Sequence, residues 1–188
     1  MNEKRLTKDD LWNVLEAWDP YMPKKIHLIA CGGTAMTLQD LKPSTRDVDF
    51  TVPKEDEYEA LIRTLEKLGY RRETGTGWTR GDGYLFDLFK GNNVFTTGLL
   101  QSPLETGNNT HVRSFKKIYV GVLNDYDLIA TKMFRGSQVD IDDCTDLIKK
   151  RGKAFDLERL KAHYKEMASY DVSEQRVMGN LQGLLNQL

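Results

Sequence analysis

The chain has few of the features that mark a secreted, membrane-spanning or disulfide-stabilised protein. Its only cysteines, Cys31 and Cys144, are more than a hundred positions apart, which fits neither a disulfide framework nor a paired-cysteine zinc site. The longest apolar run, Leu28–Cys31, is far shorter than the about 18–20 residues that cross a bilayer. The N-terminal residues 1–5 are charged, and no apolar stretch with a cleavage site follows them. We therefore expect a cytoplasmic protein with two reduced, packed thiols and no membrane partner.

An excess of charge of either sign is also absent. Lysine and arginine total 27 against 28 aspartates and glutamates, so the net charge is −1. This balance provides no general attraction to nucleic acid or to an anionic membrane, and a polynucleotide partner would have to use a local patch. The length of 188 residues, 39% of them hydrophobic, suffices for one compact domain, with or without a small helical appendage, and excludes a wholly disordered chain.

Apolar periodicity and turn residues predict an α/β half followed by a helical half. Strands are expected at 26–31, 47–52, 84–89 and 115–122, and helices at 7–18, directly after residue 33, at 54–68 and in four segments beyond residue 124. The two lysines of 115–122 indicate an edge or an exposed face, whereas residues 91–110 are polar and turn-rich. The order predicts a core over 1–121 and a C-terminal helical lobe over 122–188, packed together as one compact unit.

Three aspartates are candidates for one site. The strand at 47–52 alternates polar and apolar residues, so Asp47 and Asp49 should point to the same side. Asp87 is the single acid of an apolar strand, where burying an unpaired carboxylate costs on the order of several kcal/mol. Clustered carboxylates repel one another, and Mg²⁺ or Mn²⁺, which prefer oxygen ligands, would relieve that repulsion. The alternatives are solvent exposure of Asp47 and Asp49 and a salt bridge from an arginine to Asp87.

A second candidate feature is the turn Gly32-Gly33-Thr34, which joins a predicted strand to a predicted helix. Bare backbone N–H groups at such a turn can hold a phosphate, although two glycines there can also serve only to make the turn tight. No Gly-Lys-Ser/Thr follows, which excludes a Walker P-loop, and the later glycines lack the spacing of a dinucleotide-binding fingerprint.

These features together carry a family resemblance. Gly32-Gly33, thirteen intervening residues and then Asp47-Val48-Asp49-Phe50 resemble the signature of the DNA polymerase β-type nucleotidyltransferase superfamily, and Asp87 matches its third acid. The segments 32–35 and 44–50 are similar to the abortive-infection (AbiE-type) toxin nucleotidyltransferases and their uncharacterised relatives. The resemblance covers about residues 26–150. Gly33 departs from it, because many members of the superfamily have serine there, and the chain is shorter than full-length toxins.

The downstream part of the resemblance involves a lysine and two acids. Lys132, Asp140 and Asp143 resemble the Lys and Asp-x-x-Asp motif of the toxin group. Lys132 is expected to neutralise phosphate charge, whereas no chemical role for the two acids follows from the sequence. Acids near a predicted helix start also favour the helix dipole, so a purely structural role for Asp140 and Asp143 is the alternative.

The resemblance implies both a fold and a reaction. The fold is an α/β (α+β) nucleotidyltransferase-like core, with a short mixed sheet flanked by helices, plus the C-terminal lobe. The reaction transfers a nucleoside monophosphate from a nucleoside triphosphate (NTP) to an acceptor hydroxyl and releases pyrophosphate. The implied residues are Asp47, Asp49 and Asp87 for Mg²⁺ or Mn²⁺, with Asp87 also helping to deprotonate the hydroxyl, and Gly32, Gly33 and Thr34 for the triphosphate.

The acceptor and the partners are left open by the sequence. The toxin-like motifs suggest RNA or tRNA as the acceptor and a cognate antitoxin as a protein partner. One alternative is a non-catalytic module that binds a nucleotide or a protein on the same fold. Another is a small-molecule nucleotidyltransferase of the antibiotic-modifying type, which would share the three acids and differ only in its acceptor.

Overall fold

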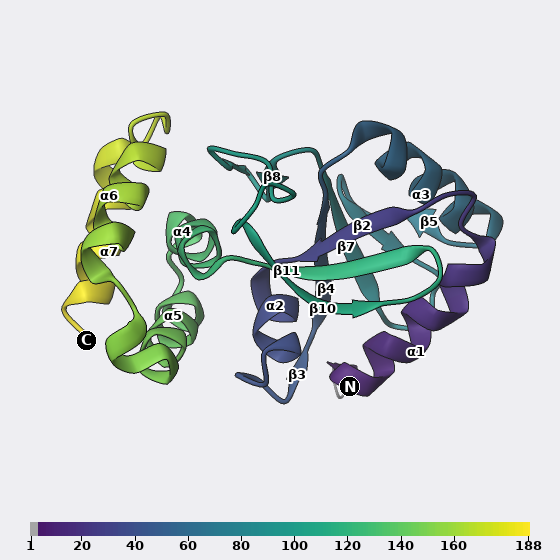
Figure 1. Ribbon diagram of the computed structural model, residues 1–188, viewed down its shortest axis with the longest axis horizontal. Coiled ribbons are helices and arrows are strands. Elements are labelled where there is room, and N and C mark those ends of the chain that lie inside the picture. Colours follow the sequence, from purple (N-terminus) through teal and green to yellow (C-terminus); the bar gives the residue numbers. More distant parts are fainter. Residues whose placement is uncertain (1–3) are drawn as a thin grey trace.

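The computed structural model describes residues 4–188, and part of the charged N-terminal segment, residues 1–3, lies outside them. The sequence predicted the helices well, in part because several of them begin or end at local capping signals. Thr7 and Asp10 form a reciprocal capping box at the first helix, and Gly69 (φ +87°) follows the third. The helices are α1 (Lys8–Trp18), α2 (Gly32–Leu38), α3 (Glu55–Lys67), α4 (Asp125–Arg135), α5 (Gln138–Arg151), α6 (Leu157–Ala168) and α7 (Glu174–Leu185) (Figure 1).

A mixed sheet forms the centre of the structure. The strands are β1 (Leu6–Thr7), β2 (Ile26–Ala30), β3 (Ser44–Thr45), β4 (Asp47–Val52), β5 (Arg71–Arg72), β6 (Gly77–Thr79), β7 (Leu85–Lys90), β8 (Asn93–Val94), β9 (Thr97–Gly98), β10 (Asn109–Ser114) and β11 (Ile118–Leu123). Among residues 4–188, seven of them pair in the order β10-β11-β2-β4-β7-β6-β5. The pairs β11–β2 and β4–β7 are parallel and the others antiparallel, which confirms the predicted mixed α/β class.

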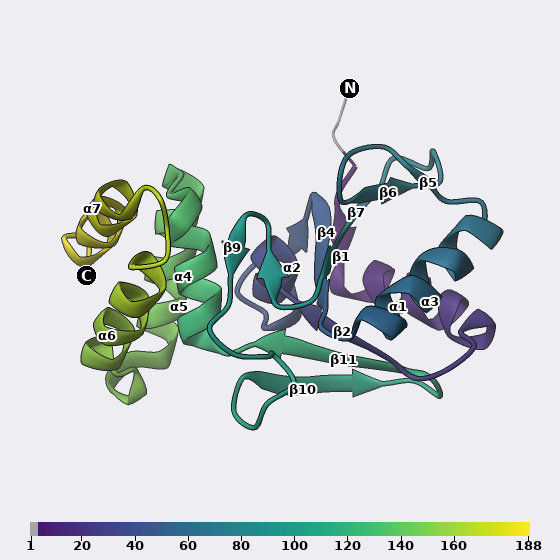
Figure 2. The same cartoon turned by 90° about the horizontal axis from the view of Figure 1, so that it is seen from above.

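One face of the sheet is closed by α1 and α3 (Figure 2). On this face the ring of Trp18 packs against Phe86 and Tyr70, with ring centroids 4.9 and 5.5 Å apart. Val48 and Phe50 of β4, which alternate with the predicted acidic positions, are completely buried. The acidic positions of β4 therefore face the opposite side of the sheet, because side chains alternate along a strand.

The expectation for residues 115–122 was wrong about the sheet edge. The strand β11 starts at Ile118 and lies between β10 and β2, whereas Lys116 and Lys117 belong to the turn that joins β10 to β11. The edge strand is β10, of which only the first two residues fall in the segment expected to be turn-rich. Most of its residues are exposed or half-buried, so it lacks the polar–apolar alternation by which a half-buried strand is recognised.

Helices α4 to α7 form a lobe beside the sheet (Figures 1 and 2). The lobe has its own packed centre, where the Tyr164 ring lies edge-on to Phe134 and its hydroxyl donates to the carbonyl of Val177 at 2.8 Å. It contacts the rest of the chain through α4, which packs on α2, and through Lys150, whose ammonium donates to the carbonyl of Gln39 at 2.8 Å. In the described chain, every helix is too short or too polar to cross a membrane.

Candidate active site

The three predicted aspartates lie on one face of the sheet. Strands β4 and β7 are parallel and in a register that pairs Asp49 with Asp87 and Asp47 with Leu85. Paired residues of neighbouring strands point to the same side, and so do residues two apart in one strand, so all three carboxylates project from the face opposite to α1. Adjacent strands are about 4.8 Å apart and alternate residues about 6.6 Å apart, which puts the three side chains within reach of one another.

Asp49 is the buried member of the group. It is 6% exposed, which overturns the alternative of a solvent-facing position for this residue, whereas Asp47 is half-buried. Burial, together with the nearby charges of Asp87 and Asp47, raises the pKa of the Asp49 carboxyl to about 7. A carboxylate in this position is stabilised by any positive charge that can approach it.

Gly32 lies directly against this carboxylate. Its φ of +54° is in the left-handed region, and a Cβ atom at this position would be 2.3 Å from Oδ2 of Asp49. Only glycine satisfies both the backbone conformation and the close approach. The Gly-Gly turn therefore has a steric role beside the acidic strand, whatever else it binds.

Two threonine hydroxyls tie the turn to β4. Thr34 is completely buried, and its Oγ1 accepts a hydrogen bond from the backbone N–H of Asp49 at 2.9 Å. Thr45 donates to the carbonyl of Asp47 at 2.8 Å, and a Cβ atom on Gly33 would lie 2.7 Å from its Oγ1. These contacts fix the start of β4 against the start of α2. The predicted contact of Thr34 with a nucleotide stays a prediction.

Asp87 accepts a hydrogen bond from a threonine. Its Oδ1 is 2.8 Å from Oγ1 of Thr76, and the half-buried carboxylate has no arginine partner in residues 4–188. The alternative of an arginine salt bridge is therefore wrong for the described chain. The hydroxyl of Thr76 is uncharged, so this hydrogen bond does not relieve the repulsion between the Asp87 and Asp49 carboxylates.

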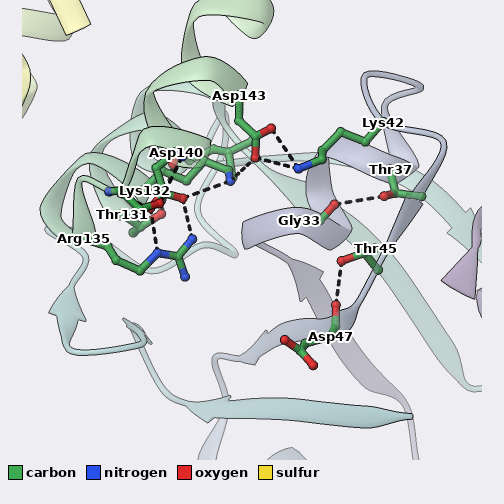
Figure 3. A network of polar contacts seen from close by, with 12 residues as sticks. Gly33, Thr37, Lys42, Thr45, Asp47, Thr131, Lys132, Arg135, Asp140 and Asp143 are labelled. Atoms are coloured by element: carbon green, nitrogen blue, oxygen red, sulfur yellow. Dashed lines mark hydrogen bonds and ion pairs between the residues drawn. The ribbon is translucent and has the colours of Figure 1, made fainter. Parts of the chain in front are cut away.

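A cluster of ion pairs lies next to the acidic strand, where the lobe meets the segment after α2 (Figure 3). Lys132 is 2% exposed, and its ammonium is 2.7 Å from Oδ2 of Asp143 and 3.5 Å from Oδ1 of Asp140. Lys42 reaches the same Asp143 at 2.9 Å, so this acid joins the lobe to the loop after α2. The predicted motif residues Lys132, Asp140 and Asp143 are thus brought together by the fold.

Asp140 also has a structural role at the start of α5, which the sequence offered as the alternative to a chemical role. Ser137 begins α5 with a capping box in which Asp140 accepts hydrogen bonds from the hydroxyl and backbone N–H of Ser137. Arg135 adds a bidentate pair, from Nε at 2.8 Å and from Nη2 at 2.5 Å. Burial alone would raise the pKa of Asp140, but the hydrogen bonds from Arg135 and Ser137 and the charge of Lys132 outweigh it and lower the pKa to about 2.

The donor set of the acidic face suits a hard divalent cation. Its members are carboxylate oxygens, which Mg²⁺ and Mn²⁺ prefer, and burial of Asp49 gives a cation a strong electrostatic reason to bind. Among residues 4–188, no three His, Cys, Asp or Glu side chains are already gathered closely enough to hold a metal ion. Binding would therefore need the side chains of Asp47, Asp49 and Asp87 to rotate toward a shared point.

Two cavities are relevant to the location of the site. One of about 340 Å³ opens beside Asp47 and is also lined by Lys4, Arg46 and Tyr84. A larger one of about 580 Å³ lies between the segment after β9 and the lobe, where His163 pairs with Asp127 at 2.7 Å. Asp47, one of the three candidate site residues, lines the smaller cavity, so the size of a cavity does not identify the site here.

Sequence reasoning missed the residues that support the acids. Thr45, Thr76 and Lys42 each contact a predicted site residue, but they are separated from it by two, eleven and about a hundred positions. Arg135, which pairs with Asp140, was also missed. Its spacing of five residues before Asp140, across a helix end, was the one signal that could have suggested the pair.

Comparisons with known proteins give no family assignment. No family model matches the chain, and no curated protein matches it either. Among solved structures, the chain is similar to a candidate nucleotidyltransferase from Thermotoga maritima, at 13% identity and a TM-score of 0.47, with 80% of this chain and 100% of that chain covered. It is also similar to an antigenic nucleotidyltransferase-like protein from Paracoccidioides brasiliensis, at 15% identity and a TM-score of 0.49, with 98% and 91% covered. Both TM-scores are below 0.5, so the case for a function rests on the residues of the site.

Proposed function

We propose that this chain is a metal-dependent nucleotidyltransferase that moves a nucleoside monophosphate from an NTP to an acceptor hydroxyl. The observation that carries the proposal is the pairing of Asp49 with Asp87 across two parallel strands, with Asp47 on the same face and Gly32 packed against the buried carboxylate. A purely structural arrangement would not be expected to pair Asp49 directly with Asp87, whose side-chain partner is an uncharged hydroxyl, because the repulsion between the two carboxylates destabilises the fold.

Asp47, Asp49 and Asp87 are the residues that would hold Mg²⁺ or Mn²⁺. Such an ion, when bound, neutralises phosphate charge and makes an acceptor hydroxyl more acidic. Gly32 leaves room for the Asp49 carboxylate, and Thr34 and Thr45 hold the backbone that presents Asp47 and Asp49. These contacts fix the backbone from which the carboxylates project, so only rotation of the side chains is needed to bring their oxygens to a shared ion.

In the transfer step, the acceptor oxygen forms a bond to the α-phosphorus while the bond from that phosphorus to the bridging oxygen of pyrophosphate breaks. The hydroxyl proton passes to the carboxylate of Asp87 and then to solvent. The hydrogen bond from Thr76 holds one oxygen of Asp87, which leaves the other oxygen to accept the proton. Pyrophosphate leaves with the electron pair of the broken bond.

The finer assignments belong to the same proposal. Gly32, Gly33 and Thr34 are proposed to line the triphosphate, and Lys132 to add positive charge from the ion-pair cluster. RNA, including tRNA, is the acceptor class to test first, in line with the toxin-like motifs of the sequence. The toxin role and a cognate antitoxin are part of the same hypothesis.

The first experiment measures binding. Titration calorimetry of the four common NTPs, with Mg²⁺, with Mn²⁺ and with EDTA, should show binding that depends on the metal, and the melting temperature should rise with the metal–NTP pair because ligands stabilise the folded state. Asp49→Asn should lose this binding. Binding of no NTP in the presence of either metal would contradict the proposal.

The second experiment measures turnover. Labelled NTPs are incubated with total RNA and, separately, with a pool of hydroxyl-bearing metabolites, and the release of pyrophosphate and the labelled product are followed. Label on RNA supports the proposed acceptor class, and label on a metabolite supports a small-molecule transferase. Metal-dependent binding without transfer to either pool favours a non-catalytic module.

A further inference from the structure

Arg135 is a cation held in place on two sides and open on the rest. Asp140 accepts from Nε and Nη2 on one edge of the guanidinium. The ring of Phe95 covers one of its faces, with Cζ of Arg135 4.6 Å from the ring centroid. The side chain is nevertheless 45% exposed, and Nη1 has no hydrogen-bond acceptor in the part of the chain that the structure describes. Its free N–H groups are therefore available to a ligand.

Lys132 differs from Arg135 in this respect. Its ammonium is enclosed, with the side chain 2% exposed, and both of its carboxylate partners lie within the lobe. A ligand could reach it only after displacing Asp143 or Asp140. Of Lys132 and Arg135, only Arg135 can be contacted by a ligand in the arrangement observed.

Phe95, which supports the guanidinium, has a strained backbone. Its φ of +54° is in the left-handed region, which residues other than glycine, asparagine and aspartate rarely adopt. Its ring packs on Phe89 of β7, with centroids 4.8 Å apart, two residues beyond Asp87. Strain of this kind persists where the surroundings determine the conformation. The stack of Phe89, Phe95 and Arg135 thus links the position of the guanidinium to the strand that carries Asp87.

The guanidinium also faces the acidic strand. Figure 3 shows Arg135 on the side of the lobe that is turned toward Gly33 and Asp47. The positive charge of Arg135 also acts on the buried carboxylate of Asp49. It lowers the pKa of that carboxyl, although the larger effect of burial raises it. In the cluster itself, Lys42, Lys132 and Arg135 share the two carboxylates of Asp140 and Asp143, so one positive charge remains in excess. This excess lies where a polyanion beside the acidic face would be.

We propose that Arg135 is a phosphate-binding residue of the site, and that its guanidinium, oriented by Asp140 and Phe95, donates its free N–H groups to the polyphosphate chain of the nucleotide. This inference rests on the proposed function, because it assigns the polyphosphate to the face that carries Asp47, Asp49 and Asp87. Arginine suits the role because its planar fork can pair with Asp140 on one edge and with phosphate oxygens on another. The base and the sugar of the nucleotide take no part in this contact.

The test uses inorganic triphosphate with Mg²⁺ as the probe, since it has neither base nor sugar, alongside the four NTPs. Arg135→Gln should weaken the binding of inorganic triphosphate and of NTPs by similar factors, about 10- to 100-fold, the usual effect of losing charge-assisted hydrogen bonds. Arg135→Lys should lose less, because it keeps the charge but not the fork. A urea midpoint measured for each variant reports whether it is folded.

Arg151→Gln is the matched control. Arg151 also makes a bidentate pair, with Asp125 from Nε at 2.6 Å and from Nη2 at 2.9 Å, and it lies in the same lobe with similar exposure. Its loss should leave the affinity for inorganic triphosphate unchanged. If Arg135→Gln does not fold, the comparison of Arg135→Lys with the parent decides, because a structural role that needs only charge predicts no loss of affinity.

The outcomes separate this inference from the proposed function. A parent protein that binds Mg–NTP, together with an Arg135→Gln variant that binds inorganic triphosphate equally well, overturns the role of Arg135 alone. A parent protein that binds neither NTP nor inorganic triphosphate with Mg²⁺ or Mn²⁺ overturns both proposals. A loss for NTPs without a loss for inorganic triphosphate also contradicts the inference, because the contact would then be with the nucleoside.

Discussion

Asp49 and Asp87 stand directly opposite each other on β4 and β7, although 38 positions separate them in the chain. One of the two is buried and the other is half-buried, and no cation lies between them in the described chain. From this relationship we expect the stability of the fold to depend on pH, and we expect single substitutions to separate the proposed metal binding from the proposed transfer.

The free energy of unfolding should fall as the pH rises from about 4 to about 7 in metal-free buffer. The pKa of Asp49 is about 7 in the folded chain, against about 3.9 in an unfolded one. Between these values the folded state binds the extra proton, so raising the pH favours unfolding. Asp49→Asn should remove this slope. At pH 8 its free energy of unfolding should exceed that of the parent by on the order of 1–3 kcal/mol.

Urea unfolding at pH 5, 6, 7 and 8 with EDTA measures this difference. Asp146→Asn is the control, because Asp146 is an exposed acid of α5, and its pH profile should follow that of the parent. Equal slopes for Asp49→Asn and the parent would show that Asp49 does not titrate in this range.

The opposite dependence is expected for Asp140. Arg135 and Ser137 hold its pKa at about 2 in spite of burial, so the folded state loses this stabilisation as the pH falls from about 4 to about 2. Asp140→Asn should destabilise the protein at pH 7 by about 3–5 kcal/mol, because it leaves the buried Lys132 with a single carboxylate. The variant should also lose less stability than the parent on acidification, which circular dichroism in urea can follow. A parent-like urea midpoint at pH 7 would contradict the assignment.

Gly32→Ala should damage the site as well as the fold. Its Cβ atom would lie 2.3 Å from the Asp49 carboxylate, on a backbone with positive φ, so the carboxylate must move. Gly69→Ala is the matched control, since Gly69 also has a positive φ but has open space around it. Both variants should lose about 1 kcal/mol or more of stability, but only Gly32→Ala should lose metal-dependent binding of NTP in a calorimetric titration. Full binding by a folded Gly32→Ala protein would mean that the position of Asp49 is not critical.

Asp87→Asn should separate binding from turnover. Its partner is the hydroxyl of Thr76, which can donate to an amide oxygen as well, so we expect a stability loss of less than about 1 kcal/mol. The affinity for Mg–NTP should change little, because Asp47 and Asp49 remain. Turnover should fall by about 10²–10⁴ or more through loss of the proton acceptor and a metal ligand. Single-turnover kinetics and a urea melt on the same variant measure both effects, and retained turnover with a large stability loss would reverse the assignment.

Local signals in the sequence determined the helices and the acidic strand. Thr7 and Asp10 mark the start of α1 through contacts between residues three positions apart, and the alternation from Asp47 to Val52 shows that the two acids share a face. Both signals depend only on the geometry of a single element. The expectation of two packed thiols is also confirmed, since Cys31 and Cys144 are buried and form no disulfide with each other.

The tertiary structure decided which of these residues meet. The register of β4 against β7 pairs Asp87 with Asp49, and a shift by one residue would turn Asp87 to the other face. The link from Lys42 to Asp143, the support of Arg135 by Phe95 and the position of β10 at the sheet edge likewise depend on contacts between distant segments. No local spacing encodes them, because they arise from how the lobe and the sheet pack together.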